Sequence, residues 1–254
     1  MHIIAIANQK GGVGKSTTTA ALCSGLSSKG YRVLAVDLDP QGNLSYNYGV
    51  LGTQGKPTAL GVITREVGAA EAIQHTTCGD IIAGSQQLAG ADMFLDKTGK
   101  EYQLKEALEG IKGQYELIII DTPPSLGILT INALTCADKV IIPAQADIYS
   151  IQGIQQLVDT IDTVKKYCNP SLKVEGILLT RYSSRSILSK DLLESISKMA
   201  GAIGTKVFNT TIREGIAVKE AQISQQHLVD YAPKSNAASD YIDFVNELVK
   251  GMKA

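Results

Sequence analysis

The sequence predicts an α/β protein with a doubly wound, mostly parallel sheet and helices on both faces. Six short runs rich in Ile, Val and Leu do not alternate with polar residues, which is typical of strands buried on both faces. Helical patterns separate these runs, and right-handed crossovers between parallel strands then give a doubly wound sheet. The runs are HIIAIA from His2, RVLAVD from Arg32, DIIAG from Asp80, ELIIID from Glu116, KVIIPA from Lys139 and VEGILLT from Val174.

Three helices stand out from their periodicity and their ends. A helix predicted over 16–29 ends before Gly30, a residue that favours helix termination. A second, over 151–167, ends before Pro170 and carries one apolar stripe: Ile151, Ile154, Leu157, Val158, Ile161 and Val164. The last is predicted over about 239–250. Because no linker divides the chain, we expect one domain over residues 1–254.

Composition excludes several classes of protein. The chain has 254 residues, of which 44% are hydrophobic and 19% charged, as in soluble globular proteins. The four cysteines form no CxxC pair and have no histidine at ligand spacing, so we expect free thiols in a reducing cytosol, with neither a disulfide framework nor a zinc site. No stretch of about 20 apolar residues is present to span a membrane.

A glycine-rich segment follows the first predicted strand and precedes the first predicted helix. It reads Gln9-Lys10-Gly11-Gly12-Val13-Gly14-Lys15-Ser16-Thr17. Glycines let backbone N–H groups turn toward phosphate oxygens, and the helix N-terminus adds positive potential. In such a P-loop, Lys15 binds the β- and γ-phosphates and the Ser16 hydroxyl ligates Mg²⁺. The strict pattern has Gly where this chain has Gln9, and Lys10 is an additional lysine. Residues 10–17 are therefore expected to bind a nucleotide.

Three carboxylates follow strands near this loop. Asp121 ends one apolar run, while Asp37 and Asp39 end another. P-loop enzymes need an acidic residue at the end of a neighbouring strand to hold Mg²⁺. We assign Asp121 to Mg²⁺, Asp39 to positioning the attacking water, and Asp37 to supporting the metal shell.

These motifs resemble the deviant Walker A ATPases of the ParA/MinD group, which are P-loop NTPases. The residues that carry the resemblance are Lys10-Gly-Gly-Val-Gly-Lys15-Ser16-Thr17, Asp37-Leu-Asp39-Pro-Gln-Gly-Asn43 and Ile120-Asp121-Thr-Pro-Pro124. Further matches indicate the ParA, or Soj-like, branch: Leu88-Ala-Gly-Ala-Asp92, Ile131-Asn-Ala-Leu134, Glu220-Ala221 and Tyr231-Ala-Pro-Lys-Ser-Asn236. Together they cover nearly the whole chain.

The resemblance implies a Mg²⁺-dependent ATPase with weak basal turnover that dimerises on binding ATP. Lys10 of each subunit would reach the nucleotide of the other and stabilise charge that develops on the leaving group. Lys10, Lys15 and Asp39 are then the catalytic residues. By the same resemblance, adenine contacts are expected at Thr180-Arg181 and at Ile212-Arg213.

The resemblance to ParA-type proteins implies two partners: double-stranded DNA, bound without sequence preference, and a ParB-like centromere-binding protein. The net charge of −1 conceals a basic stretch, because ten Lys or Arg and only four Asp or Glu fall within 165–219, a net +6. Candidate DNA contacts are Arg185, Lys190, Lys198 and Lys219. The resemblance gives only weak support for individual DNA contacts, because this chain has Ala217 and Lys219 in the stretch where many ParA proteins have an arginine. We expect a cytoplasmic, nucleoid-associated protein of plasmid or chromosome partition.

Three other functions fit the sequence less well. A MinD-like ATPase would cycle on a membrane or position another cargo, but it needs a basic amphipathic C-terminal helix. Here Asp240, Asp243 and Glu247 oppose Lys250 and Lys253, so no membrane contact is expected. An ATPase like the nitrogenase iron protein would need a cysteine just after Asp121, and residues 121–127 contain none. An ATP-gated scaffold without turnover would not need Asp39.

Overall fold

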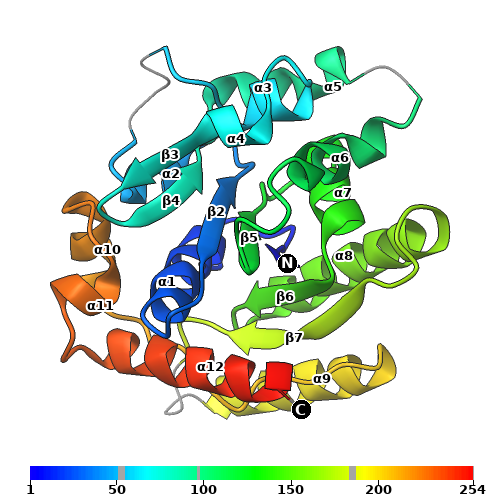
Figure 1. Ribbon diagram of the computed structural model, residues 1–254. Coiled ribbons are helices and arrows are strands. Elements are labelled where there is room, and N and C mark those ends of the chain that lie inside the picture. The colour runs from blue at the N-terminus through cyan, green and yellow to red at the C-terminus, as the bar shows by residue number, and fades with distance from the viewer. Residues whose placement is uncertain (51–54, 96–97, 183–186, 254) are drawn as a thin grey trace.

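The computed structural model describes residues 1–50, 55–95, 98–182 and 187–253. Seven strands form one sheet in the order β3-β4-β2-β5-β1-β6-β7 (Figure 1). All neighbouring pairs are parallel except β3 with β4. The predicted doubly wound, mostly parallel sheet is therefore confirmed. The strands are β1 (His2–Ile6), β2 (Val33–Asp37), β3 (Ile73–Thr76), β4 (Gly79–Ile82), β5 (Leu117–Asp121), β6 (Lys139–Ala144) and β7 (Lys173–Leu179).

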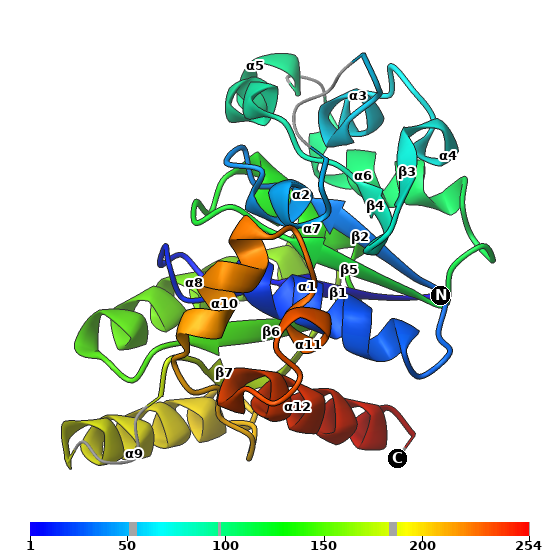
Figure 2. The same cartoon turned by 90° about the vertical axis from the view of Figure 1, so that its left-hand side faces the viewer.

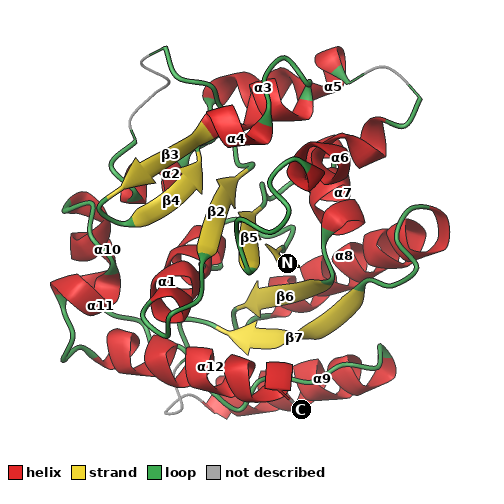
Figure 3. Cartoon of the chain, in the orientation of Figure 1, coloured by secondary structure: helices red, strands yellow, loops and turns green. Residues whose placement is uncertain are grey.

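Helices cover both faces of this sheet, as the red ribbons on either side of the yellow strands in Figure 3 show. One face carries α1 (Lys15–Ser27), α2 (Asn43–Asn47), α10 (Ile216–Ile223), α11 (Leu228–Tyr231) and α12 (Asn236–Lys253). The other carries α3 (Ala59–Ile63), α4 (Ala69–Ala72), α5 (Ala91–Phe94), α6 (Gln103–Glu109), α7 (Ile128–Cys136), α8 (Ile148–Tyr167) and α9 (Ile187–Ala202). Two 3₁₀ helices span Gln86–Gly90 and Lys100–Tyr102.

The central strands are apolar throughout because successive side chains enter different cores. In β1, Ile3 and Ala5 belong to one buried cluster, whereas Ile4 and Ile6 belong to the other. Side chains alternate between the two faces of a strand, and here both faces are covered by helices. Among the described residues, no helix is both long enough and apolar enough to cross a membrane.

Several element boundaries differ from the prediction. The strand β3 was not predicted, because it lies at the sheet edge and its residues, IQHT, are only partly buried. The helix α8 begins at Ile148, before the predicted 151, because the Asp147 carboxylate caps it by accepting a hydrogen bond from the Ser150 N–H. The four cysteines are free thiols.

The sheet order brings the motifs to one edge. The strand β1 lies between β5 and β6, and the strand order reverses there. The chain runs from β1 to β2 on one side of β1, and later passes from β5 to β6 on the other side. In open α/β sheets, ligands bind at such a switch point, beyond the carboxyl ends of the strands. The glycine-rich loop follows β1, and Asp121 ends the adjacent β5 in register with Ile6. In Figure 2 this edge faces left, with α2, α10 and the first turn of α1 around it.

The close approach of α1 and α12 depends on Gly25. A Cβ placed there would lie 2.7 Å from Cγ2 of Val245, a buried α12 residue. Contacts this short force a side chain or a helix to move, and overpacking a core typically costs about 1–3 kcal/mol.

We therefore expect Gly25→Val to lower the free energy of unfolding by about 1–3 kcal/mol, measured by urea denaturation. Adding Val245→Ala should recover part of this loss by making room. The matched control is Gly201→Val in α9, where nothing lies within 4 Å of the added Cβ. If Gly25→Val is as stable as Gly201→Val, the two helices are not packed as described.

Candidate functional site

The glycine-rich loop links β1 to the first turn of α1. Gly12 and Gly14 adopt φ angles of +75° and +88°, a region in which side chains with a Cβ are strained. Gly14 is the N-cap of α1, and no side chain caps the helix there. The first N–H groups of a helix have no partner within the helix, so this end is suited to bind an anion.

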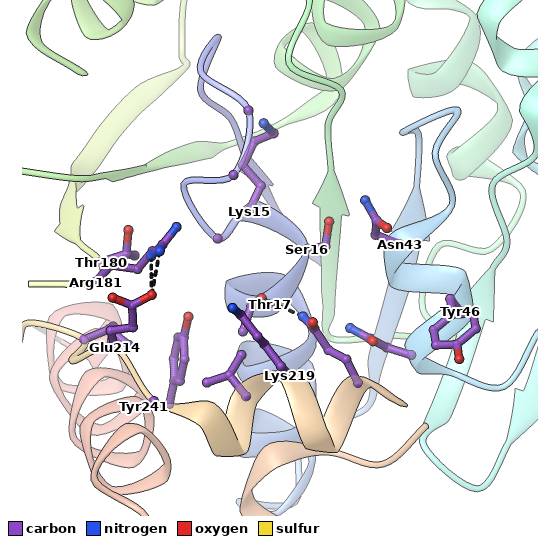
Figure 4. Close-up of a pocket in the computed structure, with 18 of the residues that line it drawn as sticks. Lys15, Ser16, Thr17, Asn43, Tyr46, Thr180, Arg181, Glu214, Lys219 and Tyr241 are labelled. Atoms are coloured by element: carbon purple, nitrogen blue, oxygen red, sulfur yellow. Dashed lines mark hydrogen bonds and ion pairs between the residues drawn. The ribbon is translucent and has the colours of Figure 1, made fainter. Parts of the chain in front are cut away.

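A cavity of about 670 Å³ opens beside this loop (Figure 4). Its volume is typical of small-ligand sites. It is lined by most of the predicted nucleotide contacts: Gly11, Gly12, Gly14, Lys15, Ser16, Thr17, Thr180, Arg181, Ile212 and Arg213. Asp39 and Lys219 also line it, whereas Lys10, Val13, Asp37 and Asp121 are not among its lining residues. Sequence reasoning assigned no contact to Gln41, although it lies in the motif from Asp37 to Asn43. It also missed residues that no local motif marks: Tyr46, Asn47, Glu214, Val218, Gln222, Ile223 and Tyr241.

Asp121 is fully buried, and neither of its carboxylate oxygens has a hydrogen-bond partner. Burial raises the pKa of Asp121 well above its usual value, and the charge of Asp37 raises it further, while Ser16 and Lys15 act in the opposite direction. An unpartnered buried carboxylate is costly unless a cation or a proton satisfies it. This orphaned group, with the Ser16 hydroxyl nearby, suits a divalent cation with oxygen ligands.

Asp37 is also fully buried, but protein groups satisfy it. One oxygen accepts a hydrogen bond from the Asp39 N–H at 3.0 Å, and the other accepts from the N–H and hydroxyl of Ser45 at 2.9 and 2.6 Å. Burial raises the pKa of Asp37 to about 6, although these hydrogen bonds lower it. The carboxylate thus joins the end of β2 to α2. A role in the metal shell stays a prediction, and here Asp37 organises the segment that contains Asp39.

Asp39 and Lys15 both line the cavity. One Asp39 oxygen accepts from the Gln41 N–H at 3.0 Å. The Lys15 side chain is buried, and its ammonium donates to the Lys10 carbonyl at 3.2 Å. Burial lowers the pKa of Lys15, whereas the charges of Asp121 and Asp39 raise it. A ligand with phosphate groups would supply the anionic partner that this ammonium needs.

The Lys10 side chain is held away from the cavity. Its ammonium forms an ion pair with Asp147 and donates to Gln145 Oε1 at 3.2 Å. Burial alone would raise the pKa of Asp147, but the hydrogen bond from Lys10 and that from the Ser150 N–H hold it below its usual value. Sequence reasoning missed this pair. A capping residue before a helical pattern is a recognisable signal, but it does not identify Lys10 as the partner.

Thr180 and Arg181, at the end of β7, also line the cavity. The Thr180 hydroxyl donates to the Val13 carbonyl at 2.7 Å, which joins the end of β7 to the glycine-rich loop. Arg181, at φ +50°, donates from Nε to Glu214 at 3.0 Å. Arg213 forms a hydrogen-bonded ion pair with Asp240, so both arginines have acidic partners (Figure 4 shows the pair of Arg181).

Of the four candidate DNA contacts, the structure describes the side chains of Lys198 and Lys219. Arg185 lies outside the described residues, and Lys190 belongs to α9 but its side chain is outside them as well. Lys198, also on α9, pairs with Glu194 at 2.7 Å. Lys219 lies on α10, on the wall of the cavity. The basic stretch counted along the sequence is therefore divided between helices.

Comparisons with known proteins agree with the motifs and show the family to which the chain belongs. A family model described as "AAA domain" matches residues 1–174. The Sporulation initiation inhibitor protein Soj of Bacillus subtilis is 40% identical over 249 residues, covering 97% of each chain. The Chromosome partitioning protein ParA of Caulobacter vibrioides is 36% identical, covering 98% of this chain and 94% of its own. The chain belongs to the ParA/Soj family of deviant Walker A partition ATPases, in the ParA/MinD group.

Solved structures support the same assignment. The structure titled cobyrinic acid a,c-diamide synthase from Mycobacterium smegmatis, with an ATP analog and magnesium, is 35% identical with a TM-score of 0.88 over 100% of this chain and 96% of its own. A putative plasmid partition protein from Borrelia burgdorferi bound to AMPPNP is 27% identical, with a TM-score of 0.82 over 98% and 99%. MinD from Pyrococcus horikoshii with Mg-ADP is 26% identical, with a TM-score of 0.77 over 100% and 98%.

We expect the buried, unpartnered carboxylate of Asp121 to lower the stability of the ligand-free protein while it provides a ligand for a cation. Because the folded state raises this pKa, the folded chain binds more protons than the unfolded chain, so stability falls as pH rises above the usual value of 3.8. We expect Asp121→Asn to raise the free energy of unfolding at pH 8 by about 1–3 kcal/mol, with a smaller gain as pH falls toward 4.

Urea denaturation of the ligand-free protein between pH 4.5 and pH 8 measures this gain. The matched control is Asp243→Asn, an exposed position on α12 that should change stability by less than about 0.5 kcal/mol at either pH. A loss of stability in Asp121→Asn at pH 8 would contradict the described environment.

Proposed function

We propose that this protein is a Mg²⁺-dependent ATPase that acts as a molecular switch in DNA partition. The observation that carries the proposal is the buried carboxylate of Asp121, without a hydrogen-bond partner, beside a glycine-rich helix N-terminus and the buried Lys15. A nucleoside triphosphate with Mg²⁺ would satisfy all three groups together. The nucleotide complexes of the related structures support this choice of ligand.

The roles of the residues follow from their positions. The N–H groups of residues 11–17 would bind the phosphate oxygens, and Lys15 would bind the terminal phosphates. Ser16 and Asp121 would hold Mg²⁺, which neutralises charge on the phosphates when it is bound. The base would lie toward Thr180-Arg181 and Ile212-Arg213, where the cavity continues.

Hydrolysis needs a water molecule aligned with the terminal phosphate. Asp39 lines the cavity, and its segment is fixed by the hydrogen bonds of Asp37 and Ser45. Asp39 would position that water, with a slow basal rate. Lys10 would act in an ATP-bound homodimer by leaving Asp147 and reaching the nucleotide of the second subunit, where its charge stabilises the leaving group.

Hydrolysis would end each cycle of DNA binding. The relatives named Soj and ParA, each similar over nearly its full length, support a partition role. In this proposal the ATP dimer binds double-stranded DNA without sequence preference and so associates with the nucleoid, and a ParB-like protein stimulates its release. Because one fold serves proteins named for different activities, the partition role rests on the sequence relatives rather than on the fold.

A membrane-cycling role is less well supported. An amphipathic anchor needs its apolar face free to enter the headgroup region. In α12, Phe244, Val245 and Leu248 are buried against the same core as α1, and Asp240 pairs with Arg213. The apolar face of this helix is therefore already covered by the protein.

The two roles are separated by one binding experiment. Fluorescence anisotropy with a labelled nonspecific DNA duplex, and cosedimentation with anionic vesicles, are each measured with ATPγS, with ADP and without nucleotide. We expect ATPγS to raise DNA affinity at least tenfold over ADP, with a marked loss at higher salt. ATP-dependent binding to vesicles without binding to DNA would reject the partition role.

Replacing Asp39 tests hydrolysis separately from binding. We expect Asp39→Ala to lower steady-state phosphate release at least a hundredfold, since water loses its positioning group, while affinity for a fluorescent ATP analogue changes less than threefold. Asp243→Ala, at an exposed position, is the control and should retain normal turnover. Normal turnover in Asp39→Ala would remove Asp39 from the catalytic residues.

A further inference from the structure

The helix α10 is the most weakly anchored wall of the cavity. Of its eight residues only Ala221 is buried, and no side chain caps its N-terminus at Gly215. Ile216 and Ile223 are 77% and 74% exposed. With few buried contacts, a short helix of this kind needs little free energy to shift or open.

Residues on opposite sides of α10 have different surroundings. Val218, Lys219, Gln222 and Ile223 line the cavity. Ile216, Lys219, Glu220 and Ile223 are exposed and follow one another at helical spacing, so they form one outward stripe, called here the outer stripe. Lys219 and Ile223 belong to both sets, so the stripe and the cavity wall meet at these two residues. Any movement of α10 relative to the cavity therefore also moves the outer stripe.

One side-chain hydrogen bond connects the last turn of α10 to the phosphate-binding helix. Gln222 Nε2 donates to the Thr17 hydroxyl at 3.1 Å. Among the described residues, this is the one side-chain hydrogen bond between α10 and α1. Thr17 directly follows Ser16 in the first turn of α1, where phosphate and Mg²⁺ would bind. Figure 4 shows Thr17 and Lys219 on facing helices.

The chain just beyond α10 is fixed at a second place. The Cys78 thiol donates to the Gln225 carbonyl at 3.6 Å, and the His227 ring nitrogen Nε2 lies 2.7 Å from the Cys78 carbonyl. His227 also packs edge-on against Tyr48, next to α2. These contacts hold the C-terminal end of the helix and leave its N-terminal end, at Gly215, uncapped. The Gln222–Thr17 bond lies at this same end and joins the last turn of α10 to the first turn of α1.

We propose that Gln222 is a positioning residue that couples α10 to nucleotide occupancy. Ordering of the first turn of α1 by a bound nucleotide fixes the Thr17 hydroxyl, and Gln222 then holds α10, with its outer stripe, in one position. Without nucleotide the first turn of α1 lacks the contacts of the ligand, and in this proposal α10 then opens more often. A ligand shifts an equilibrium only through such a difference in contacts between two states. The inference rests on the proposed binding of ATP.

Hydrogen exchange with mass spectrometry tests the coupling. In the wild-type protein we expect ATPγS with Mg²⁺ to slow amide exchange in α10 by about two- to tenfold, the range that one hydrogen bond provides. Gln222→Met keeps the length of the side chain but cannot donate, and it should remove most of this nucleotide-dependent slowing. A purely structural role would instead change exchange equally with and without nucleotide.

Gln226→Met is the matched control, because Gln226 is an exposed glutamine just beyond α10 whose backbone N–H donates to the Ala221 carbonyl. It should keep the wild-type response. By linkage, Gln222→Met should also weaken ATPγS binding by the same factor by which it reduces the slowing in α10.

The outcomes separate this inference from the proposed function. If ATPγS binds and slows exchange in residues 11–17 but not in α10, the coupling is wrong and the ATPase proposal stands. An undiminished response of α10 in Gln222→Met would equally overturn the role of Gln222. If the wild-type protein binds no ATPγS, both proposals fail.

Discussion

The burial of Asp121 is the constraint on which the rest of the site depends. Because both faces of the central sheet are covered by helices, polar groups occur at the ends of its strands, and β5 ends on a carboxylate that no protein group satisfies. Asp37 ends the neighbouring strand in register with it and takes its hydrogen bonds from Ser45 and Asp39. An unpartnered buried carboxylate lowers the stability of the empty protein and favours a bound cation. The ligand-free site is therefore organised for a ligand that carries both phosphates and a metal ion.

In the proposed ATP-bound homodimer, Lys10 would give the same site a second state. Its ammonium cannot pair with Asp147 and at the same time reach a nucleotide in another subunit. In the single chain, Asp147 and Gln145 hold it beside the N-terminus of α8, outside the cavity. An ion pair whose side chains are 26% and 32% exposed to water is weak enough to exchange for a stronger anionic partner. In the proposed dimer, competition between Asp147 and phosphate oxygens for Lys10 would be the physical basis of a switch that depends on association.

Much of this could be predicted from the sequence, because it is encoded locally. The loop before Lys15 and the carboxylates at strand ends lie within short motifs, and buried parallel strands are recognisable from continuous apolar runs. The pairs Lys10 with Asp147 and Thr17 with Gln222 join residues 137 and 205 positions apart, and no local pattern specifies them. The edge strand β3 was missed because its side chains are only partly buried. Counting charge along 165–219 identifies a basic segment, but the partners of its side chains depend on the fold: Lys198 pairs with Glu194 on α9, and Lys219 lies on α10.

The central claim, that ATP binding transfers Lys10 from its own chain to a second one, is tested most directly by sedimentation velocity. With ATPγS and Mg²⁺ the wild-type protein should sediment as a dimer, and with ADP as a monomer. Lys10→Ala should remain a monomer with ATPγS while still binding a fluorescent ATP analogue, and Asp147→Asn should dimerise at lower protein concentration because Lys10 is released. The exposed Lys29→Ala serves as the control and should behave as the wild type. A Lys10→Ala protein that dimerises as the wild type does would contradict the account.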